Sequence, residues 1–199
     1  MVNSSYIFYI KSLCSSLNYQ LRNISRIRRF LDRDTCHLVV RTLILSRLDY
    51  GNGLLLGSSN KDILRLQRIQ NWSAKLIYCA KKFDHATPYL RELHWLPVRE
   101  RITFKIMMYV FKCLAGTAPD YLTSCISLYR PTRTGLRSAS DVTRLTEHNS
   151  YKTLKSSDDR SFVQKAPHIW NTLPTNIRES TSLSTFKKSL KTHLFSCYF

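Results

Sequence analysis

Acidic residues are scarce in this sequence. Of its 199 residues, 13 are Asp or Glu, whereas 31 are Lys or Arg, so the formal net charge is +18 at pH 7. Enzymes that use two metal ions need carboxylates that converge on one site. The only adjacent acidic pair, Asp158-Asp159, precedes an apolar segment and suits a helix N-terminus better, where negative charge is favoured. We therefore expect no two-metal site and no catalytic residue in this chain.

Long apolar runs and paired cysteines are also missing. No stretch approaches the ~18 consecutive apolar residues of a membrane span. The N-terminal residues lack the basic-then-apolar order and the small-residue cleavage site of a signal peptide. The six cysteines are scattered and none stands in a C-x-x-C pair, which favours reduced thiols. These absences predict a nuclear or cytoplasmic protein that is not secreted and has no membrane partner.

Signatures of metal sites, phosphate loops and activated nucleophiles are absent too. Cys79, His85 and His94 could supply three metal ligands, but their intervals match no standard zinc spacing. The glycine-rich stretch "GNGLLLGSS" lacks the Lys-Ser/Thr step of a phosphate-binding loop. No serine stands in G-x-S-x-G. We expect the chain to bind no cofactor of its own.

Apolar residues recur at three- and four-residue steps, which predicts amphipathic helices. The first spans about residues 4–23, and Asp34 or Thr35 caps a second. A third begins near Ser59, which stands at capping-box spacing from Asp62. The predicted inward faces are Ile10, Leu13, Leu17, Leu21 and Ile24 in the first helix, Leu38, Val39, Thr42, Leu45 and Leu48 in the second, and Ile63, Leu66, Ile69, Ser73, Leu76 and Ala80 in the third.

Proline and glycine mark the later helices. Thr87-Pro88 predicts a cap followed by the first residue of a short helix. Pro97 starts a longer helix, and Gly116 ends it. The inward face predicted for the helix that Pro97 starts is Ile102, Ile106, Tyr109 and Cys113. A later helix, bent at Pro167, should bury Phe162, Ala166, Ile169 and Trp170. The last helix, capped by Ser182, should bury Leu183, Phe186, Leu190 and Leu194.

Together these patterns predict a mainly α fold. A helical bundle occupies residues 1–80 and a helical continuation residues 81–127. Residues 128–157 are polar, basic and rich in turn residues, and they form a linker, either a loop or short strands near 142–145 and 151–154. C-terminal helices occupy residues 158–199.

Basic side chains form the candidate binding surface. Five arginines fall within twelve residues, and a second basic stripe runs along the outer face of the third predicted helix. Guanidinium groups bind phosphate in a bidentate way and keep their charge at any relevant pH. Solvated helix faces are the alternative, but the lopsided charge favours nucleic acid. The candidate residues are Arg22, Arg26, Arg28, Arg29, Arg33, Lys61, Arg65, Arg68 and Lys75.

Three tryptophans could stack on nucleic-acid bases. Trp95 and Trp170 both stand close to a Leu-Pro step, in "HWLP" and "HIWNTLP". A tryptophan in that position is more often a core anchor, so we predict that both are buried. Trp72 has no such neighbour, and its role stays open.

Several long stretches carry a resemblance to a known family. They occur in this order: "LILSRLDYGNGLLLG", "LQRIQNWSAKLI", "HATPYLRELHWLPVRERITFKIMMYVFKCLAGTAPDYL", "YRPTRTGLRSAS", "RSFVQKAPHIWNTLP" and "LSTFKKSLKTHLF". From about residue 11 to 195, the chain closely resembles the C-terminal part of reverse transcriptases from jockey-like non-LTR (LINE-type) retrotransposons. It departs from the family at Gly51-Asn52-Gly53, where Cys-Asn-Ser is usual.

The resemblance implies a role in RNA-directed DNA polymerisation for the parent enzyme. In that family the segment follows the polymerase palm, so residues 4–80 would be the thumb, which holds the template–primer duplex by its backbone. The Mg²⁺-binding palm aspartates, the fingers and the endonuclease have no counterpart here. The implied expectation is a truncated, non-enzymatic remnant that binds RNA, RNA–DNA duplex or DNA without sequence specificity.

A second interpretation is a protein-interaction or scaffold domain. In a thumb without its palm, the apolar docking surface would be exposed and could drive self-association. An inert genomic relic with no nucleic-acid role is the remaining alternative. An independent enzyme would need a converging acid or histidine cluster, and the sequence offers none.

Overall fold

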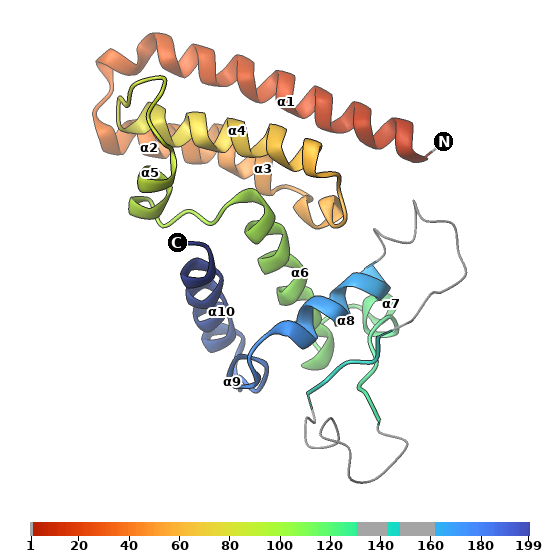
Figure 1. Cartoon of the computed structure of the whole chain (residues 1–199). Helices are drawn as coiled ribbons and strands as arrows, with labels where there is room; N and C mark the ends of the chain where they lie inside the picture. The colour runs from red at the N-terminus through yellow and green to blue at the C-terminus, as the bar shows by residue number, and fades with distance from the viewer. Residues whose placement is uncertain (1, 131–142, 148–161) are drawn as a thin grey trace. The chain divides into compact units, whose positions relative to one another are not determined.

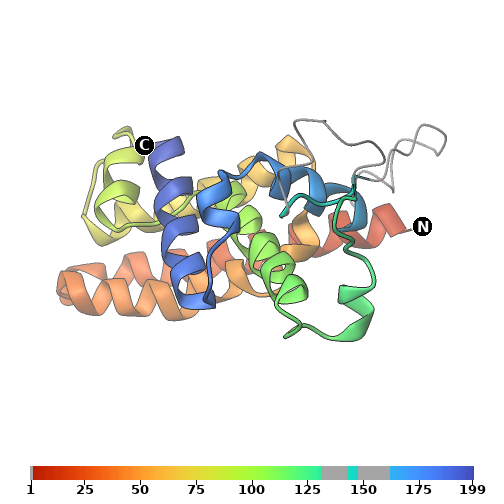
Figure 2. The same cartoon turned by 90° about the horizontal axis from the view of Figure 1, so that it is seen from below.

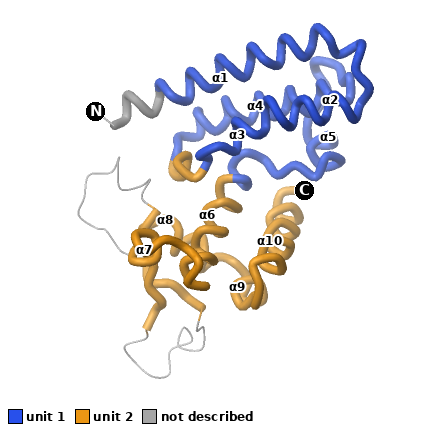
Figure 3. Tube along the Cα trace, turned by 180° about the vertical axis from the view of Figure 1, so that it is seen from behind, with its two compact units in different colours: residues 1–52, 58–101 blue, residues 53–57, 102–199 orange. Residues whose placement is uncertain are grey.

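The computed structural model describes residues 2–130, 143–147 and 162–199, with side chains from residue 8 onward (Figure 1). The described residues are mainly helical, which confirms the predicted fold class. They form two compact units: unit 1 holds residues 1–52 and 58–101, and unit 2 holds residues 53–57 and 102–199 (Figure 3). The division between them falls within one long helix, Val98–Leu114. Most of the predicted 128–157 linker lies outside the described residues, as does the Asp158-Asp159 pair.

Unit 1 is built from helices that pack side by side. Helix α4 contacts both α1 and α2 (Figures 1 and 2). The elements are α1 (Val2–Ile27), the 3₁₀ turn η1 (Arg28–Phe30), α2 (Arg33–Val40), the π turn η2 (Arg41–Leu45), α3 (Ser46–Asp49), the 3₁₀ turn η3 (Asn52–Leu55), α4 (Asn60–Ile77), α5 (Thr87–Glu92) and the first turn of α6 (Val98–Leu114). The predicted inward face of α1 is buried throughout, because its spacing matches the helical period.

The second predicted helix differs from its expectation in its cap and in part of its face. Asp32 is the N-cap, and its Oδ2 accepts from the Thr35 N–H at 3.4 Å, so neither Asp34 nor Thr35 caps it. Leu38 is 64% exposed. The buried side chains are Cys36, Val40, Ile44, Leu45 and Leu48. The π turn at Arg41–Leu45 shifts the inward face by about one residue, so only the late positions of the predicted stripe were right.

Two of the helices start at a serine whose side chain caps them, whereas α5 starts without a side-chain cap. Ser59 caps α4 as predicted, since its hydroxyl accepts from the Asp62 N–H at 3.2 Å. Ser182 likewise caps α10 (Leu183–Tyr198) through the Thr185 N–H at 3.1 Å. Thr87 was predicted wrongly, because it is already helical and the N-cap is Ala86, which makes no side-chain bond.

Unit 2 has an aromatic core. Phe111 of α6 stacks on Phe186 of α10 with ring centroids 4.4 Å apart, and Trp170 lies 5.7 Å from Phe186. Its other helices are α7 (Asp120–Thr123), α8 (Phe162–Thr172), which contains Pro167, and α9 (Thr175–Arg178). In the described part of the predicted linker, the only ladder pairing is an isolated antiparallel bridge between Leu128 and Leu145. The second predicted strand, 151–154, lies outside the described residues.

Both tryptophans near a Leu-Pro step are core residues, as predicted. Trp95 is 6% exposed and Trp170 is fully buried. Trp95 precedes α6, whereas Trp170 lies inside α8. The stretches "HWLP" and "HIWNTLP" therefore have packing roles in two different units.

Candidate functional site

A groove of about 730 Å³ opens in unit 1 near the C-terminal end of α4. Its walls come from the end of α1, from η1, from one face of α4 and from the loop that follows α4. Five of its lining residues are cationic and none is Asp or Glu. Such a surface attracts anions, because like charges gathered around a concave surface add their fields. The cations are Arg28, Arg68, Lys75, Lys81 and Lys82, and Trp72 lies among them.

The spacing of residues along α4 sets one wall of the groove. Arg68, Trp72 and Lys75 follow one another at steps of four and three residues, which places them on one helix face. The opposite face is apolar and buried in the unit 1 core. The amphipathic pattern that folds α4 therefore also presents its polar face to the groove.

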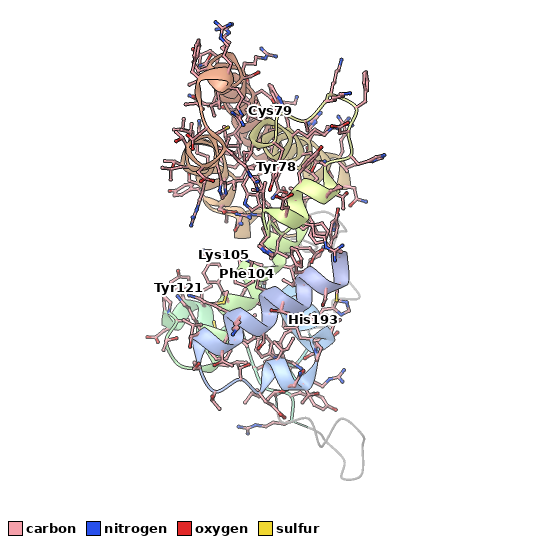
Figure 4. The ribbon with its side chains drawn as sticks, turned by 90° about the vertical axis from the view of Figure 1, so that its left-hand side faces the viewer. Tyr78, Cys79, Phe104, Lys105, Tyr121 and His193 are labelled. Atoms are coloured by element: carbon pink, nitrogen blue, oxygen red, sulfur yellow. The ribbon has the colours of Figure 1, made fainter. Side chains whose placement is uncertain are left out.

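The end of α4 determines where the following loop goes. The Ala80 N–H donates to the Lys75 carbonyl at 2.9 Å, and the Cys79 N–H donates to the Leu76 carbonyl at 3.3 Å. This is a Schellman turn, and Cys79 holds the left-handed position with a φ of 51° (Figure 4). Because the chain reverses here, Lys81 and Lys82 lie on the groove and not beyond the end of the helix.

Arg28 has a structural task at this site. Its Nε donates to the Leu76 carbonyl at 2.8 Å, one Nη donates to the Ile77 carbonyl at 2.7 Å, and the other donates to the Leu31 carbonyl at 2.6 Å. It thus caps the last carbonyls of α4, where a positive charge is favoured. Its charge contributes to the field in the groove, but each of its three nitrogens already donates to a backbone carbonyl.

Two further contacts brace the basic loop. Asp84 Oδ2 accepts from the Lys81 N–H at 2.8 Å and from the Tyr89 hydroxyl at 3.2 Å. Lys75 Nζ donates to the Lys82 carbonyl at 3.0 Å. The loop is therefore held against α4. None of the five groove cations forms an ion pair with another described residue. Arg28 and Lys75 donate to backbone carbonyls, whereas the side chains of Arg68, Lys81 and Lys82 donate no hydrogen bond to a described residue.

The other predicted binding residues lie outside this groove. Arg33 pairs with Glu92 at 2.8 Å, donates to the Tyr78 hydroxyl at 2.6 Å and lies 4.2 Å from the centre of that ring. Arg65 pairs with Asp62 at 3.3 Å. The remaining four are exposed on α1, η1 and α4: Arg22, Arg26, Arg29 and Lys61.

Of the predicted binding residues, Arg28, Arg68 and Lys75 line the groove, and Lys81 and Lys82 line it without having been predicted. The available signal was a Lys-Lys pair directly after a predicted helix. It was inconclusive because a lysine pair in a loop is usually solvated, and only the reversal at Cys79 turns it toward the groove.

The described residues contain no group of three His, Cys, Asp or Glu side chains placed to hold a metal ion. Within the part of the chain that the structure describes, no helix is long and apolar enough to cross a membrane. All six cysteines are described, and none is bridged.

Comparisons with protein-family models, with curated proteins and with solved structures found no match to this chain. The geometry of the basic groove is therefore the main guide to function.

Proposed function

We propose that unit 1 binds nucleic acid through the phosphate backbone, without sequence specificity. The observation that supports this most is the groove lined by five Lys and Arg side chains and by no acidic residue. Each phosphate that a cation neutralises releases condensed counterions, so affinity would come from charge and would fall with salt. The exposed Arg22, Arg26 and Arg29 extend the positive surface along α1 and η1.

The test is a salt titration of binding to a labelled RNA–DNA duplex, followed by fluorescence anisotropy. A triple variant, Arg68→Ala, Lys81→Ala and Lys82→Ala, removes the groove cations whose side chains donate no hydrogen bond to a described residue. We expect it to bind more weakly and to flatten the log–log salt slope by about 2 to 3, because each lost phosphate contact contributes about 0.7–0.9.

A matched control removes the same charge from unit 2. Lys187, Lys188 and Lys191 are exposed on α10, and replacing all three with Ala should change the salt slope little. Equal losses in both triple variants would mean that only net charge matters. No binding by folded wild-type chain at low salt would overturn the proposal.

We further propose, from the sequence resemblance alone, that the chain derives from the C-terminal part of a non-LTR retrotransposon reverse transcriptase. On this view the chain by itself extends no primer, and the Mg²⁺ chemistry belongs to palm residues elsewhere in the parent enzyme. A primer-extension assay with the purified chain tests the first statement. A search of the genomic sequence upstream of the coding region for the palm aspartates tests the second.

A protein-interaction domain is the second candidate. It is favoured by large apolar side chains that are exposed in unit 1: Phe8 is 73%, Tyr19 61% and Leu64 56% exposed. Concentration-dependent self-association in sedimentation velocity, abolished by Phe8→Asp and Leu64→Asp, would support it. A monomer that binds duplex would favour the nucleic-acid proposal instead.

A further inference from the structure

Trp72 is the tryptophan that the core does not use. It is half-buried and lines the basic groove, whereas Trp95 is 6% exposed and Trp170 is fully buried. Trp95 lies 5.8 Å from the His37 ring, and Trp170 lies 5.7 Å from the Phe186 ring. Trp72 makes no ring contact with any described residue. Trp72 thus lies partly exposed on the wall of a concave, cationic site.

Cations lie before and after Trp72 in the groove. Arg68 lies one helical turn before Trp72, and Lys75 lies almost one turn after it. Lys81 and Lys82 come from the loop that completes the groove. An aromatic platform flanked by backbone-binding cations is the arrangement by which proteins hold single strands, since every base has a π face.

A duplex cannot use this platform. Paired bases are stacked on one another, and only their edges reach the grooves of the helix. A side chain recessed among lysines on a protein surface can therefore meet the face of a base only if that base is unpaired. The groove volume, about 730 Å³, lies within the range of sites that enclose small organic ligands.

We propose that this groove binds single-stranded nucleic acid, with one unpaired base stacked on Trp72 and the adjoining phosphates held by Arg68, Lys81 and Lys82. The proposal rests on the nucleic-acid binding proposed above. It deepens that function by naming an unpaired strand as the preferred ligand.

The experiment is a titration of the full chain by intrinsic tryptophan fluorescence. Trp95 and Trp170 are buried, so quenching by a bound base reports on Trp72. The ligands are an oligodeoxythymidine, a two-stranded, fully paired duplex with the same number of phosphates, and inorganic polyphosphate, which has charge and no base. We expect the single strand to quench the fluorescence and polyphosphate not to. Both should displace a labelled oligonucleotide from the groove, as measured by its anisotropy.

Two variants separate stacking from folding and from charge. Trp72→Ala should lower the affinity for the single strand about tenfold and leave affinity for polyphosphate unchanged. Trp72→Phe keeps a ring and should retain most of the single-strand affinity. Circular dichroism checks that both variants are folded.

The outcomes distinguish the two proposals. If all three ligands bind, but none quenches and Trp72→Ala binds as wild type does, stacking is overturned while charge-based binding stands. If the duplex binds more tightly than the single strand at every salt concentration, the preference for an unpaired strand is overturned. If the folded chain binds no polyanion, both proposals fail together.

Discussion

Trp95 of unit 1 and Trp170 of unit 2 stand in similar sequences and are both buried, but different contacts surround them. Next to Trp95, the Leu96 carbonyl accepts from the Gln70 side chain of α4 at 2.8 Å. One turn earlier on α4, Gln67 Oε1 accepts from the Val98 N–H at 2.8 Å, at the start of α6. Neighbouring helix side chains thus fix the backbone that carries Trp95.

In unit 2 the tryptophan itself helps to hold another segment of the chain in place. The Trp170 indole N–H donates to the Thr143 carbonyl at 2.9 Å. Asn171 accepts from the Leu145 N–H at 2.9 Å and donates to the Leu145 carbonyl at 3.0 Å, as a neighbouring strand would. Buried Arg178 donates to the Thr143 hydroxyl at 3.1 Å. Three side chains thereby hold a non-helical segment, residues 143–147, against α8 and α9.

The comparison shows that similar local sequences can have opposite roles. The backbone beside Trp95 is held by other side chains, whereas Trp170 and its neighbour hold another segment. In unit 1, helix packing comes first and polar side chains secure an incoming connection. In unit 2, a few side chains replace the backbone ladder that an irregular segment lacks. We therefore expect the stability of unit 2 to be more sensitive to single substitutions, since fewer side chains hold its irregular segment in place.

The largest effect should come from Trp170→Ala. Removing this fully buried ring leaves a cavity beside Phe186 and removes the indole hydrogen bond to the Thr143 carbonyl, so we expect unit 2 to lose about 3–5 kcal/mol. Hydrogen exchange of α10 compared with α4 measures it, because the loss should be confined to α8, α9 and α10. Equal loss of protection in α4 would show that the two units unfold as one.

Gln70→Ala should have the next largest effect, in unit 1. It removes a buried donor and leaves the Leu96 carbonyl without it, at a cost of about 1–3 kcal/mol in the free energy of unfolding. Urea denaturation measures the change. Lys61→Ala, exposed on the first turn of the same helix, is the control and should stay within about 0.5 kcal/mol of wild type. A Gln70 variant as stable as the control would contradict the role given to this bond.

The Schellman turns at Cys79 and Gly116 offer a smaller pair of effects, opposite in sign. Both residues have positive φ, 51° and 66°, but only one is glycine. Gly116→Ala should destabilise unit 2 by about 1 kcal/mol; the new Cβ would have no heavy atom within 4 Å, so the cost is conformational. Cys79→Gly should raise the stability of unit 1 by about 0.5 kcal/mol. Thermal melts of the two variants measure both, and the same sign for both would refute the turn argument.

The smallest predicted effect depends on pH. The hydrogen bond from the Asn171 amide at 2.8 Å, helped by His168, holds the pKa of Glu147 below its usual value. A lowered carboxyl pKa stabilises the fold above the usual pKa, and that stability is lost as pH falls through the folded-state value. Glu147→Gln should therefore be less stable than wild type at neutral pH, by about 0.5 kcal/mol for so exposed a group, and equal to it in acid. Melting temperatures at both pH values test this, and a difference that persists in acid would exclude the linkage.

Much of the helical framework could be predicted from the sequence because it depends on local rules. The buried stripes of α1 and α10, the Ser59 and Ser182 caps and the burial of Trp95 and Trp170 all follow from spacing and neighbours within one or two turns. The inward face of α2 was partly mistaken because a π turn changes the period, and the sequence carries no clear mark of it.

The candidate site was decided by tertiary structure. Charge and helical spacing selected Arg28, Arg33 and Arg68 alike, but only the fold distinguishes them. Arg28 meets the carbonyls at the end of α4, 48 and 49 residues later, and Arg33 meets Glu92, 59 residues later, so both have partners within the chain. Arg68 has no such partner among the described residues. Periodicity decides which face of a helix is buried, whereas the availability of a cation depends on which distant helix ends pack beside it.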